Sequence, residues 1–234
     1  MPSSIALNCD CMEYMKSLPD KFFDLAVVDP PYGGAASNDA DNTFNGAIVG
    51  RFGGRFDKYI TAERAGGTLA KKNGKEIKHW DIAPGEDYFR ELFRTSKNQI
   101  IWGGNYFQLP PTRCFLIWRK LTISENFTMA MAEYAWTSFN ENAKVFECVP
   151  QDNSGQRFHP TQKPVALYAW IFSKYAKPGD KILDTHLGSG SSRIAAYDAG
   201  LDFVGCEIDK TYFDLQEERF ERHTAQGNLF LDNL

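Results

Sequence analysis

The sequence contains no long apolar run, and its N-terminal residues lack a basic stretch followed by an apolar one. Apolar runs such as Leu25 to Val28 and Cys114 to Trp118 fall far short of the roughly 18 residues needed to cross a bilayer. We therefore expect neither a transmembrane helix nor a membrane partner. Because no secretory signal is recognisable, the expected location is cytoplasmic.

Cysteine and histidine are also scarce. The five cysteines are odd in number and scattered, and the one close pair, Cys9 and Cys11, is spaced more narrowly than the usual zinc pairs. The four histidines show no H-x-x-x-H pattern. We expect reduced thiols that mostly pack in the interior, and no metal site.

An excess of charge of one sign is missing as well, because 26 Lys and Arg face 30 Asp and Glu for a formal net charge of −4. Taken alone, this balance argues against a broadly basic nucleic-acid binder, whose affinity comes from many cations facing phosphates. With 43% hydrophobic residues, the composition is that of an ordinary globular protein. The length of 234 residues suits one large domain, so we expect 1–234 to form a single unit.

What the sequence does contain is an alternation of short apolar runs with amphipathic stretches, which is typical of a parallel sheet covered by helices. We predict an α/β fold. The expected strands are 5–7, 24–28, 99–102, 114–118, 133–138, 181–184 and 203–206. The expected helices are 12–17, 88–95, 164–176, 191–199 and 212–223. Residues 34–85 show little periodicity, and 119–132 and 139–158 are expected to be loops.

Near the C-terminus, glycines follow one expected strand and acidic residues end two. Asp184 ends a strand, Gly188-Ser189-Gly190 comes next, and Glu207 stands 19 residues after Gly188. A glycine turn lets the backbone approach a ligand at a helix N-terminus, and an acid at this distance accepts ribose hydroxyls. Arg193 replaces the third glycine of an NAD site, whereas Asp184 suits a cation such as S-adenosylmethionine. A glycine-rich connection with surface acids is the alternative interpretation.

A second constellation, Asp29-Pro30-Pro31-Tyr32, directly follows the expected strand 24–28. Two prolines cannot continue a sheet or enter a helix interior, so the segment is rigid and extended. The exocyclic amine of adenine or cytosine is a poor nucleophile because its lone pair is delocalised into the ring. The Asp29 carboxylate and the Pro30 carbonyl can accept hydrogen bonds from the two N–H groups of this amine. Tyr32 can stack on an extruded base. A strand-ending turn with a core tyrosine is the alternative.

Together these segments resemble the amino-group DNA methyltransferases. Three further motifs carry the resemblance: Asn8-Cys9-Asp10-Cys11 with Leu18-Pro19-Asp20, His159-Pro160-Thr161-Gln162-Lys163-Pro164, and Gly205-Cys206-Glu207-Ile208-Asp209 with Tyr212. The catalytic motif precedes the glycines, which is the order of the β class, and 100–106 and 133–139 resemble small phage and prophage adenine methyltransferases. The resemblance implies a Rossmann-like, doubly wound, mostly parallel sheet with circularly permuted motifs and loop insertions. Asp184-Thr185-His186 departs from the family's usual Asp-Pro-Phe.

The resemblance also assigns roles. The catalytic residues would be Asp29, Pro30, Pro31 and Tyr32, with Asp29 polarising the target amine and Tyr32 stacking on the flipped base. The cofactor residues would be Asp10, Asp29, Thr161, Lys163, Asp184, Gly188, Ser189, Gly190 and Glu207. Among these, Glu207 would hold the ribose, Asp10 would lie near the cofactor adenine, and Thr161 and Lys163 would meet the methionine carboxylate. Lys163 could equally cap a helix or form a salt bridge.

Contact with DNA is expected from residues 34–85, an insertion directly after the catalytic segment. Between Arg51 and Trp80, eight basic residues face three acidic ones. We expect a basic, flexible arm that follows phosphates, with a plain solvated loop as the alternative. The candidate DNA-binding residues are Arg51, Arg55, Lys58, Arg64, Lys71 and Lys72. The expected loops 119–132 and 139–158 are candidates for target recognition.

By resemblance, Asp at the head of the tetrapeptide is associated with adenine N6, and Ser with cytosine N4. The expected activity is therefore site-specific transfer of a methyl group from S-adenosylmethionine to N6 of a flipped adenine in double-stranded DNA. Cytosine N4 methylation is the first alternative, and a catalytically silent DNA-binding relative is the second. A protein or RNA methyltransferase is a third, although such relatives more often open the tetrapeptide with Asn. The resemblance leaves a homodimer open.

Overall fold

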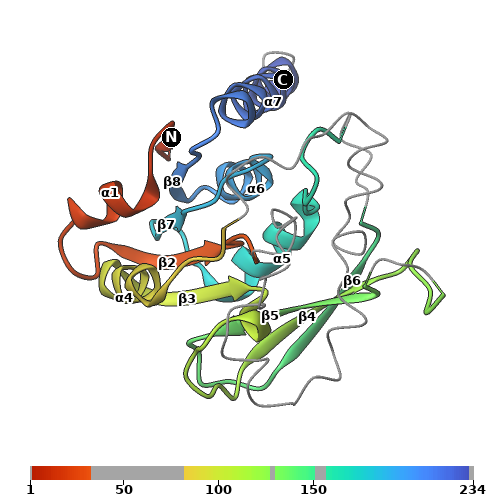
Figure 1. Ribbon diagram of the computed structural model, residues 1–234. Coiled ribbons are helices and arrows are strands. Elements are labelled where there is room, and N and C mark those ends of the chain that lie inside the picture. The colour runs from red at the N-terminus through yellow and green to blue at the C-terminus, as the bar shows by residue number, and fades with distance from the viewer. Residues whose placement is uncertain (1, 33–81, 127–129, 151–156, 232–234) are drawn as a thin grey trace.

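The computed structural model describes residues 2–32, 82–126, 130–150 and 157–231 (Figure 1). Its centre is an eight-stranded sheet in the order β1-β8-β7-β2-β3-β5-β4-β6. The strands are β1 (Ser4–Leu7), β2 (Phe23–Val28), β3 (Ser96–Trp102), β4 (Phe115–Lys120), β5 (Ala132–Thr137), β6 (Lys144–Cys148), β7 (Lys181–Asp184) and β8 (Asp202–Cys206). Every pairing is parallel except those of β5 with β3 and β4. The predicted α/β fold with a mostly parallel sheet is confirmed.

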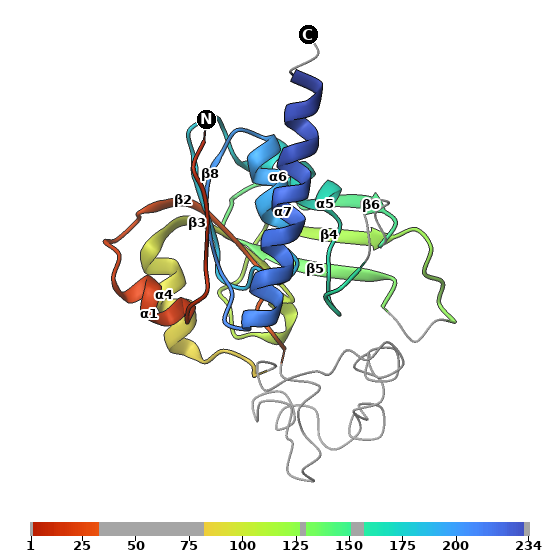
Figure 2. The ribbon, with the colours of Figure 1, turned by 90° about the horizontal axis from the view of Figure 1, so that it is seen from above.

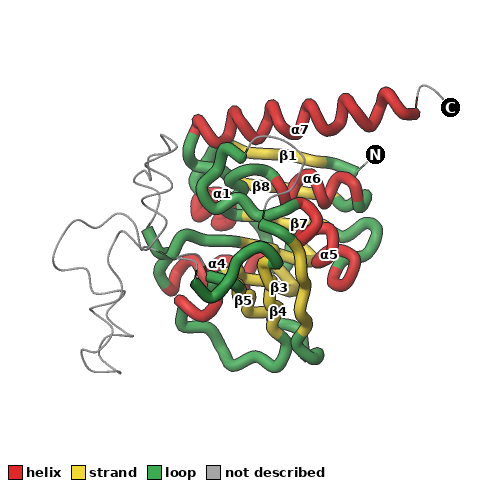
Figure 3. The backbone as a smooth tube through the Cα atoms, turned by 90° about the vertical axis from the view of Figure 1, so that its right-hand side faces the viewer, coloured by secondary structure: helices red, strands yellow, loops and turns green. Residues whose placement is uncertain are grey.

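Helices cover both faces of this sheet (Figure 2). They are α1 (Cys11–Lys16), α4 (Glu86–Thr95), the 3-10 helix η2 (Gly104–Tyr106), α5 (Val165–Tyr175), α6 (Ser191–Asp198) and α7 (Lys210–Leu231). α1 and α4 pack on one face, and α5 and α6 pack on the other. α7 runs alongside α6 and β1 (Figure 3). None of the helices in the described part of the chain is long and apolar enough to cross a membrane.

The central strand β2 shows why the chain folds this way. Its apolar residues are continuous rather than alternating, because a strand covered on both faces needs apolar side chains on both. Leu25 and Val27 pack into the α5 and α6 layer, whereas Ala26 and Val28 pack into the α1 and α4 layer. All four are almost completely buried. The end of β2 is therefore held rigidly, and Asp29 follows at that end.

The predicted loop 139–158 is wrong at its centre, because β6 lies within it. β6 pairs in parallel with β4 and forms the edge of the sheet. Phe146 and Cys148 pack against the core, while Val145 is 60% exposed. Two inward-facing residues make a weak alternating signal, which is why the sequence did not reveal this strand. The predicted loop 119–132 likewise begins inside β4, and α7 extends well beyond the predicted 212–223.

Candidate active site

The two constellations singled out in the sequence meet at the carboxyl end of the sheet. β2 pairs directly with β7 through Leu25 with Ile182 and Ala26 with Leu183. Both strands run in the same direction, so Asp29 after β2 and Asp184 at the end of β7 come to the same edge. Ligands of open α/β sheets bind at this edge. The negative charge of Asp29 is among the influences that raise the pKa of Asp184, which places both carboxyl groups in one electrostatic environment.

Both carboxylate oxygens of Asp29 have partners within the chain. The hydroxyl of Tyr32 donates to Oδ1 at 2.8 Å, and the ammonium of Lys163 binds Oδ2. Burial raises the pKa of Tyr32 well above its usual value, and the charges of Asp29 and Glu133 raise it further, so this phenol stays a donor. Pro30, which lies between Asp29 and Tyr32 in the sequence, is buried. The tetrapeptide is thus an ordered acceptor site with its carboxylate held from two sides.

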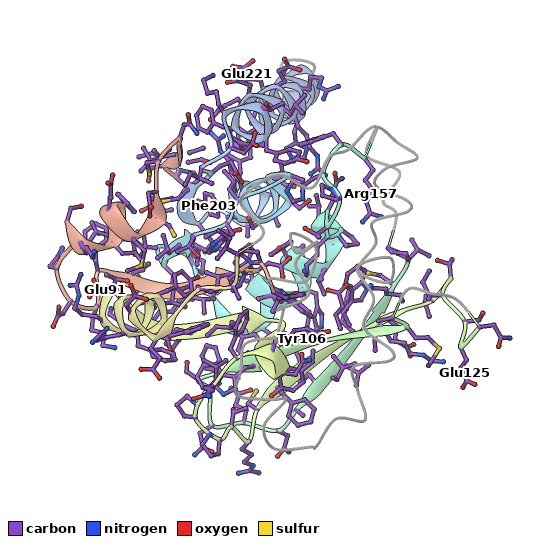
Figure 4. All side chains as sticks on the ribbon, in the orientation of Figure 1. Glu91, Tyr106, Glu125, Arg157, Phe203 and Glu221 are labelled. Atoms are coloured by element: carbon purple, nitrogen blue, oxygen red, sulfur yellow. The ribbon has the colours of Figure 1, made fainter. Side chains whose placement is uncertain are left out.

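The ring of Tyr32 is fixed by residues that follow β3. It stacks on Tyr106 with ring centroids 4.6 Å apart and an angle of 26° between the planes. Gly103 has φ of +67°, and a Cβ there would lie 2.1 Å from Cε1 of Tyr32, so only glycine fits. Tyr106 is 39% exposed. Its position after β3 is labelled in Figure 4. A base that stacks on the same face of Tyr32 must therefore insert between the two rings or displace the Tyr106 ring.

Lys163 lies between two carboxylates. Besides Asp29 it contacts Glu133 at 3.2 Å, and Glu133 in turn pairs with Lys120 at 2.6 Å. The side chains of Lys163 and Lys120 are only 4% and 6% exposed. Burial lowers the pKa of Lys163, but the charges of Asp29 and Glu133 outweigh it and hold that pKa above its usual value. Of the roles predicted for Lys163, the salt bridge is formed, and the contact with a cofactor carboxylate stays a prediction.

The glycine turn after β7 has a backbone that other groups can approach closely. Gly188 and Gly190 have φ of +52° and +74°, and a Cβ on Gly188 would lie 3.3 Å from the His159 ring. α6 begins directly after this turn. The guanidinium of Arg219, on α7, donates to the Ser189 carbonyl and the Ser191 hydroxyl, both at 2.9 Å. The backbone of the turn is thereby anchored to a neighbouring helix.

Asp184 and Glu207 are buried acids, at 2% and 8% exposed, so the alternative of surface acids is wrong. Asp184 accepts hydrogen bonds from the Ser192 hydroxyl at 2.5 Å and from the His186 backbone N–H at 3.1 Å. Burial raises the pKa of Asp184 to about 7, and the charges of Asp29 and Glu207 add to this effect. A cationic ligand next to a buried carboxyl with such a pKa stabilises the ionised form of that carboxyl.

Glu207 holds the other side of the turn. Its carboxylate accepts the backbone N–H groups of Gly188 and Asp209, each at 2.8 Å. Burial raises its pKa, although these N–H groups pull it down. The side chain of Asn8, at the end of β1, donates to the Glu207 carbonyl at 2.7 Å. This contact brings the N-terminal motif to the cofactor side of the site.

The remaining predicted cofactor residues lie around this set with local partners of their own. Asp10 is exposed and caps α1 by accepting the Met12 N–H at 2.7 Å. Thr161 is exposed, and its hydroxyl lies 3.2 Å from Nδ1 of the His159 ring. Their contacts to a cofactor stay predictions. The six candidate DNA-binding residues, Arg51, Arg55, Lys58, Arg64, Lys71 and Lys72, lie outside the described residues.

His186, which departs from the family pattern, packs between polar and aromatic groups. Its Nδ1 lies 2.9 Å from the Thr185 hydroxyl, which contacts the Tyr88 hydroxyl at 2.6 Å. Its ring meets the Tyr88 ring edge to face, with centroids 5.5 Å apart. Burial lowers the pKa of His186 to about 4, so the ring is neutral near pH 7. A neutral imidazole here adds no positive charge beside Asp184.

Comparison with known proteins places this geometry in a family. The family model described as DNA methylase, which covers N6 and N4 methylases, matches residues 23–218. The Type II methyltransferase M.HinfI of Haemophilus influenzae is 24% identical over 261 aligned residues, covering 95% of this chain and 69% of that protein.

Two solved structures share the fold. The M1.HpyAVI–SAM complex matches with a TM-score of 0.54 and 18% identity, over 94% of this chain and 98% of that one. The PvuII DNA methyltransferase, described as cytosine-N4-specific, matches with a TM-score of 0.63 and 13% identity, over 99% and 94%. The predicted Rossmann-like methyltransferase fold is confirmed. With its D-P-P-Y segment ahead of its glycine turn, the chain belongs to the N6/N4 DNA methylase family, in the motif order of the β class.

Proposed function

We propose that this chain transfers a methyl group from S-adenosylmethionine to N6 of adenine in double-stranded DNA. The observation that carries the proposal is the placement of Asp29, directly after β2, near Asp184, which ends the paired strand β7. An acceptor for a target amine and a buried acid suited to a cationic cofactor thus share one edge of the sheet. S-adenosylmethionine is the cofactor; its cationic methionine end suits the buried acid Asp184, and its ribose hydroxyls suit Glu207.

The residues of the tetrapeptide would orient and polarise the amine. Asp29 and the Pro30 carbonyl accept hydrogen bonds from its two N–H groups, which localises the lone pair on the nitrogen. Because Tyr32 and Lys163 already bind the Asp29 oxygens, the amine must share or replace one of these contacts. Held by Asp184 and Glu207, S-adenosylmethionine would supply an activated methyl group for direct transfer to the nitrogen. Asp29 is placed to accept the proton that the amine then loses, and positioning accounts for much of the acceleration.

The target base must leave the duplex to reach this position, since its amine is otherwise paired inside the helix. Tyr32 and Tyr106 provide aromatic faces for the extruded base. We assign target recognition to the segment 119–132, where Leu121 and Met131 are exposed beside the end of β4. The same role for 139–158 stays a prediction of the sequence. A homodimer and base extrusion stay predictions of the sequence.

The identity of the methylated base tests the proposal. The protein is incubated with methyl-labelled S-adenosylmethionine and mixed-sequence DNA, and the DNA is digested to nucleosides for mass spectrometry. Label in N6-methyladenine is the expected result. Label confined to N4-methylcytosine would select the cytosine alternative, which the same carboxylate and carbonyl acceptors also suit. Cofactor binding without label in any nucleoside would favour the catalytically silent relative.

The basic segment should supply much of the DNA affinity, because few other stretches are rich in Lys and Arg. Replacing Arg51, Arg55, Lys58, Arg64, Lys71 and Lys72 by glutamine removes six of the eight cations between Arg51 and Trp80. We expect weaker DNA binding with a shallower salt dependence, and unchanged cofactor affinity. Titration of labelled duplex at several salt concentrations measures both effects. DNA binding as tight as that of the unaltered chain would contradict this assignment.

A further inference from the structure

Glu133 is the part of the site that the proposed chemistry leaves without a role. It lies on β5, the one strand of the described sheet that runs against its neighbours. The register that pairs Trp118 with Glu133 puts the Glu133 carboxylate beside Lys120 at the end of β4. Its second oxygen reaches Lys163, whose ammonium binds Asp29. Four charged side chains thus alternate in sign and end at Asp29.

Stability alone is a poor explanation for this row of charges. Lys163 and Asp29 already neutralise each other, so Glu133 and Lys120 are not required to balance the charge at that position. Removing two further charged groups from water costs free energy that their mutual attraction does not reliably recover. Lys120 is only 6% exposed, and Glu133 is 27% exposed. Such an expensive arrangement next to an acceptor carboxylate points to a role at that carboxylate.

The contacts indicate what that role is. The ammonium of Lys163 has three N–H donors. It contacts both the Asp29 carboxylate and the Glu133 carboxylate. The aromatic ring of Trp102 lies 5.4 Å from the ammonium and limits its movement on another side. With Glu133 absent, the full charge of Lys163 would fall on Asp29, which would make Asp29 a weaker acceptor for an incoming N–H. With Glu133 present, the charge is divided.

We propose that Glu133 is a positioning residue that acts through Lys163, and this rests on the proposed function of Asp29. It holds the ammonium at a fixed position and divides its charge, so that Asp29 keeps enough negative charge to accept the target amine. Lys120 anchors Glu133 in turn. Glu133 itself touches neither base nor cofactor in this account.

The pH dependence of the site follows from the groups that surround Lys163. Lys163 interacts with Asp29 and Glu133. These two carboxylates interact in turn with the remaining titratable groups nearby, which are Tyr32, Lys120, Tyr168 and Asp184. Replacement of Glu133 by glutamine removes one of the two negative charges that keep Lys163 protonated. The titration midpoint of Lys163 should then move to lower pH by roughly 1–3 pH units. Replacement of Lys120 by methionine removes a nearby positive charge, so the Lys163 midpoint should move to higher pH.

The test compares steady-state methyl transfer by the full chain and its variants across pH. We expect Glu133→Gln to lower kcat roughly 10- to 100-fold with little change in KM for the cofactor. Glu133→Asp, which keeps the charge, should recover part of the loss. Glu91→Gln is the matched control, since it breaks an ion pair with Arg94 on α4, at 2.8 Å, and should leave kcat unchanged.

A measurement without turnover separates this proposal from the proposed function. Nitrogen-15 NMR of the lysine ammonium groups follows the titration of Lys163 in the unaltered chain and in the Glu133→Gln and Lys120→Met variants. Midpoints that shift in opposite directions support the charge division even if no DNA base is methylated. An unmoved Lys163 midpoint in Glu133→Gln overturns it. A lower kcat with an unmoved Lys163 midpoint would show a merely structural role, and wild-type kcat would overturn the proposal outright.

Discussion

Replacing Asp29 by asparagine should nearly abolish methyl transfer while S-adenosylmethionine still binds. Asparagine has the same shape, but it replaces a charged acceptor by a neutral amide beside the target amine. Electrostatic groups aimed at the reacting atoms typically contribute 10²–10³-fold to kcat, so we expect a loss of roughly that size or more. Single-turnover transfer from a preformed enzyme–cofactor complex measures the chemical step, and calorimetry measures cofactor affinity.

Asp24 offers the matched control for this experiment. It lies on the same strand β2, at the opposite end from the site, and its carboxylate pairs with Lys97 at 2.6 Å and accepts the Lys181 N–H at 2.9 Å. Asp24→Asn should cost some stability and leave transfer unchanged. Thermal unfolding of both variants checks that each is folded. Transfer at the unaltered rate by Asp29→Asn would remove Asp29 from the mechanism.

Cofactor affinity should fall as the pH drops below about 7, because Asp184 must be ionised to attract a cation. Burial, with the charges of Asp29 and Glu207, raises the pKa of Asp184 to about 7. A bound cation favours the ionised form, so binding releases the proton that Asp184 carries at lower pH. Below the pKa, the affinity should fall by up to about tenfold per pH unit. Titration calorimetry from pH 8.5 to 5.5 measures this slope.

Two variants separate Asp184 from groups that titrate on the cofactor itself. Asp184→Asn should weaken binding at pH 8 roughly 10- to 100-fold and give cofactor affinity a shallower pH dependence than in the unaltered chain. Ser192→Ala removes the 2.5 Å hydrogen bond that favours the ionised carboxylate, so the midpoint should move to higher pH. The same slope in Asp184→Asn as in the unaltered chain would show that another group titrates.

Much of the fold could be predicted because its signals are local. β2 is a continuous apolar run between turn residues, and the turn after β7 contains glycines at positions that adopt positive φ. Such features follow from the residues themselves. β6 could not be predicted, because an edge strand with two inward-facing residues is stabilised mainly by its pairing with β4. Pairing between distant segments leaves little trace in one sequence.

The same distinction applies to the site. Asp29, Asp184 and Glu207 each stand at the end of an apolar strand, and this position identified them as candidate site residues. Glu133 and Lys120 carried no such signal, because their contact depends on the antiparallel register of β5 with β4. Tyr106 was missed for a related reason. Its contact with Tyr32 arises from the pairing of β2 with β3, which brings the segments after both strands together.

Arg219 and Lys163 illustrate a further limit. Arg219 lies on α7, far along the chain from the glycine turn whose Ser189 carbonyl it binds. Only the packing of α7 beside α6 brings the two together. Lys163 had two plausible partners in the sequence, a cofactor carboxylate or another side chain. The choice of Asp29 depended on where β2 ends relative to the segment before α5.

The most direct test of the central claim is a crystal structure of the ternary complex. It would contain this protein, a cofactor analogue without a transferable methyl group, and a duplex that the labelling experiment identifies as a substrate. The account predicts an adenine outside the duplex, with its amine donating to the Asp29 carboxylate and the Pro30 carbonyl, and the analogue beside Asp184. An adenine that stays stacked in the duplex, or an amine turned away from Asp29, would contradict the account.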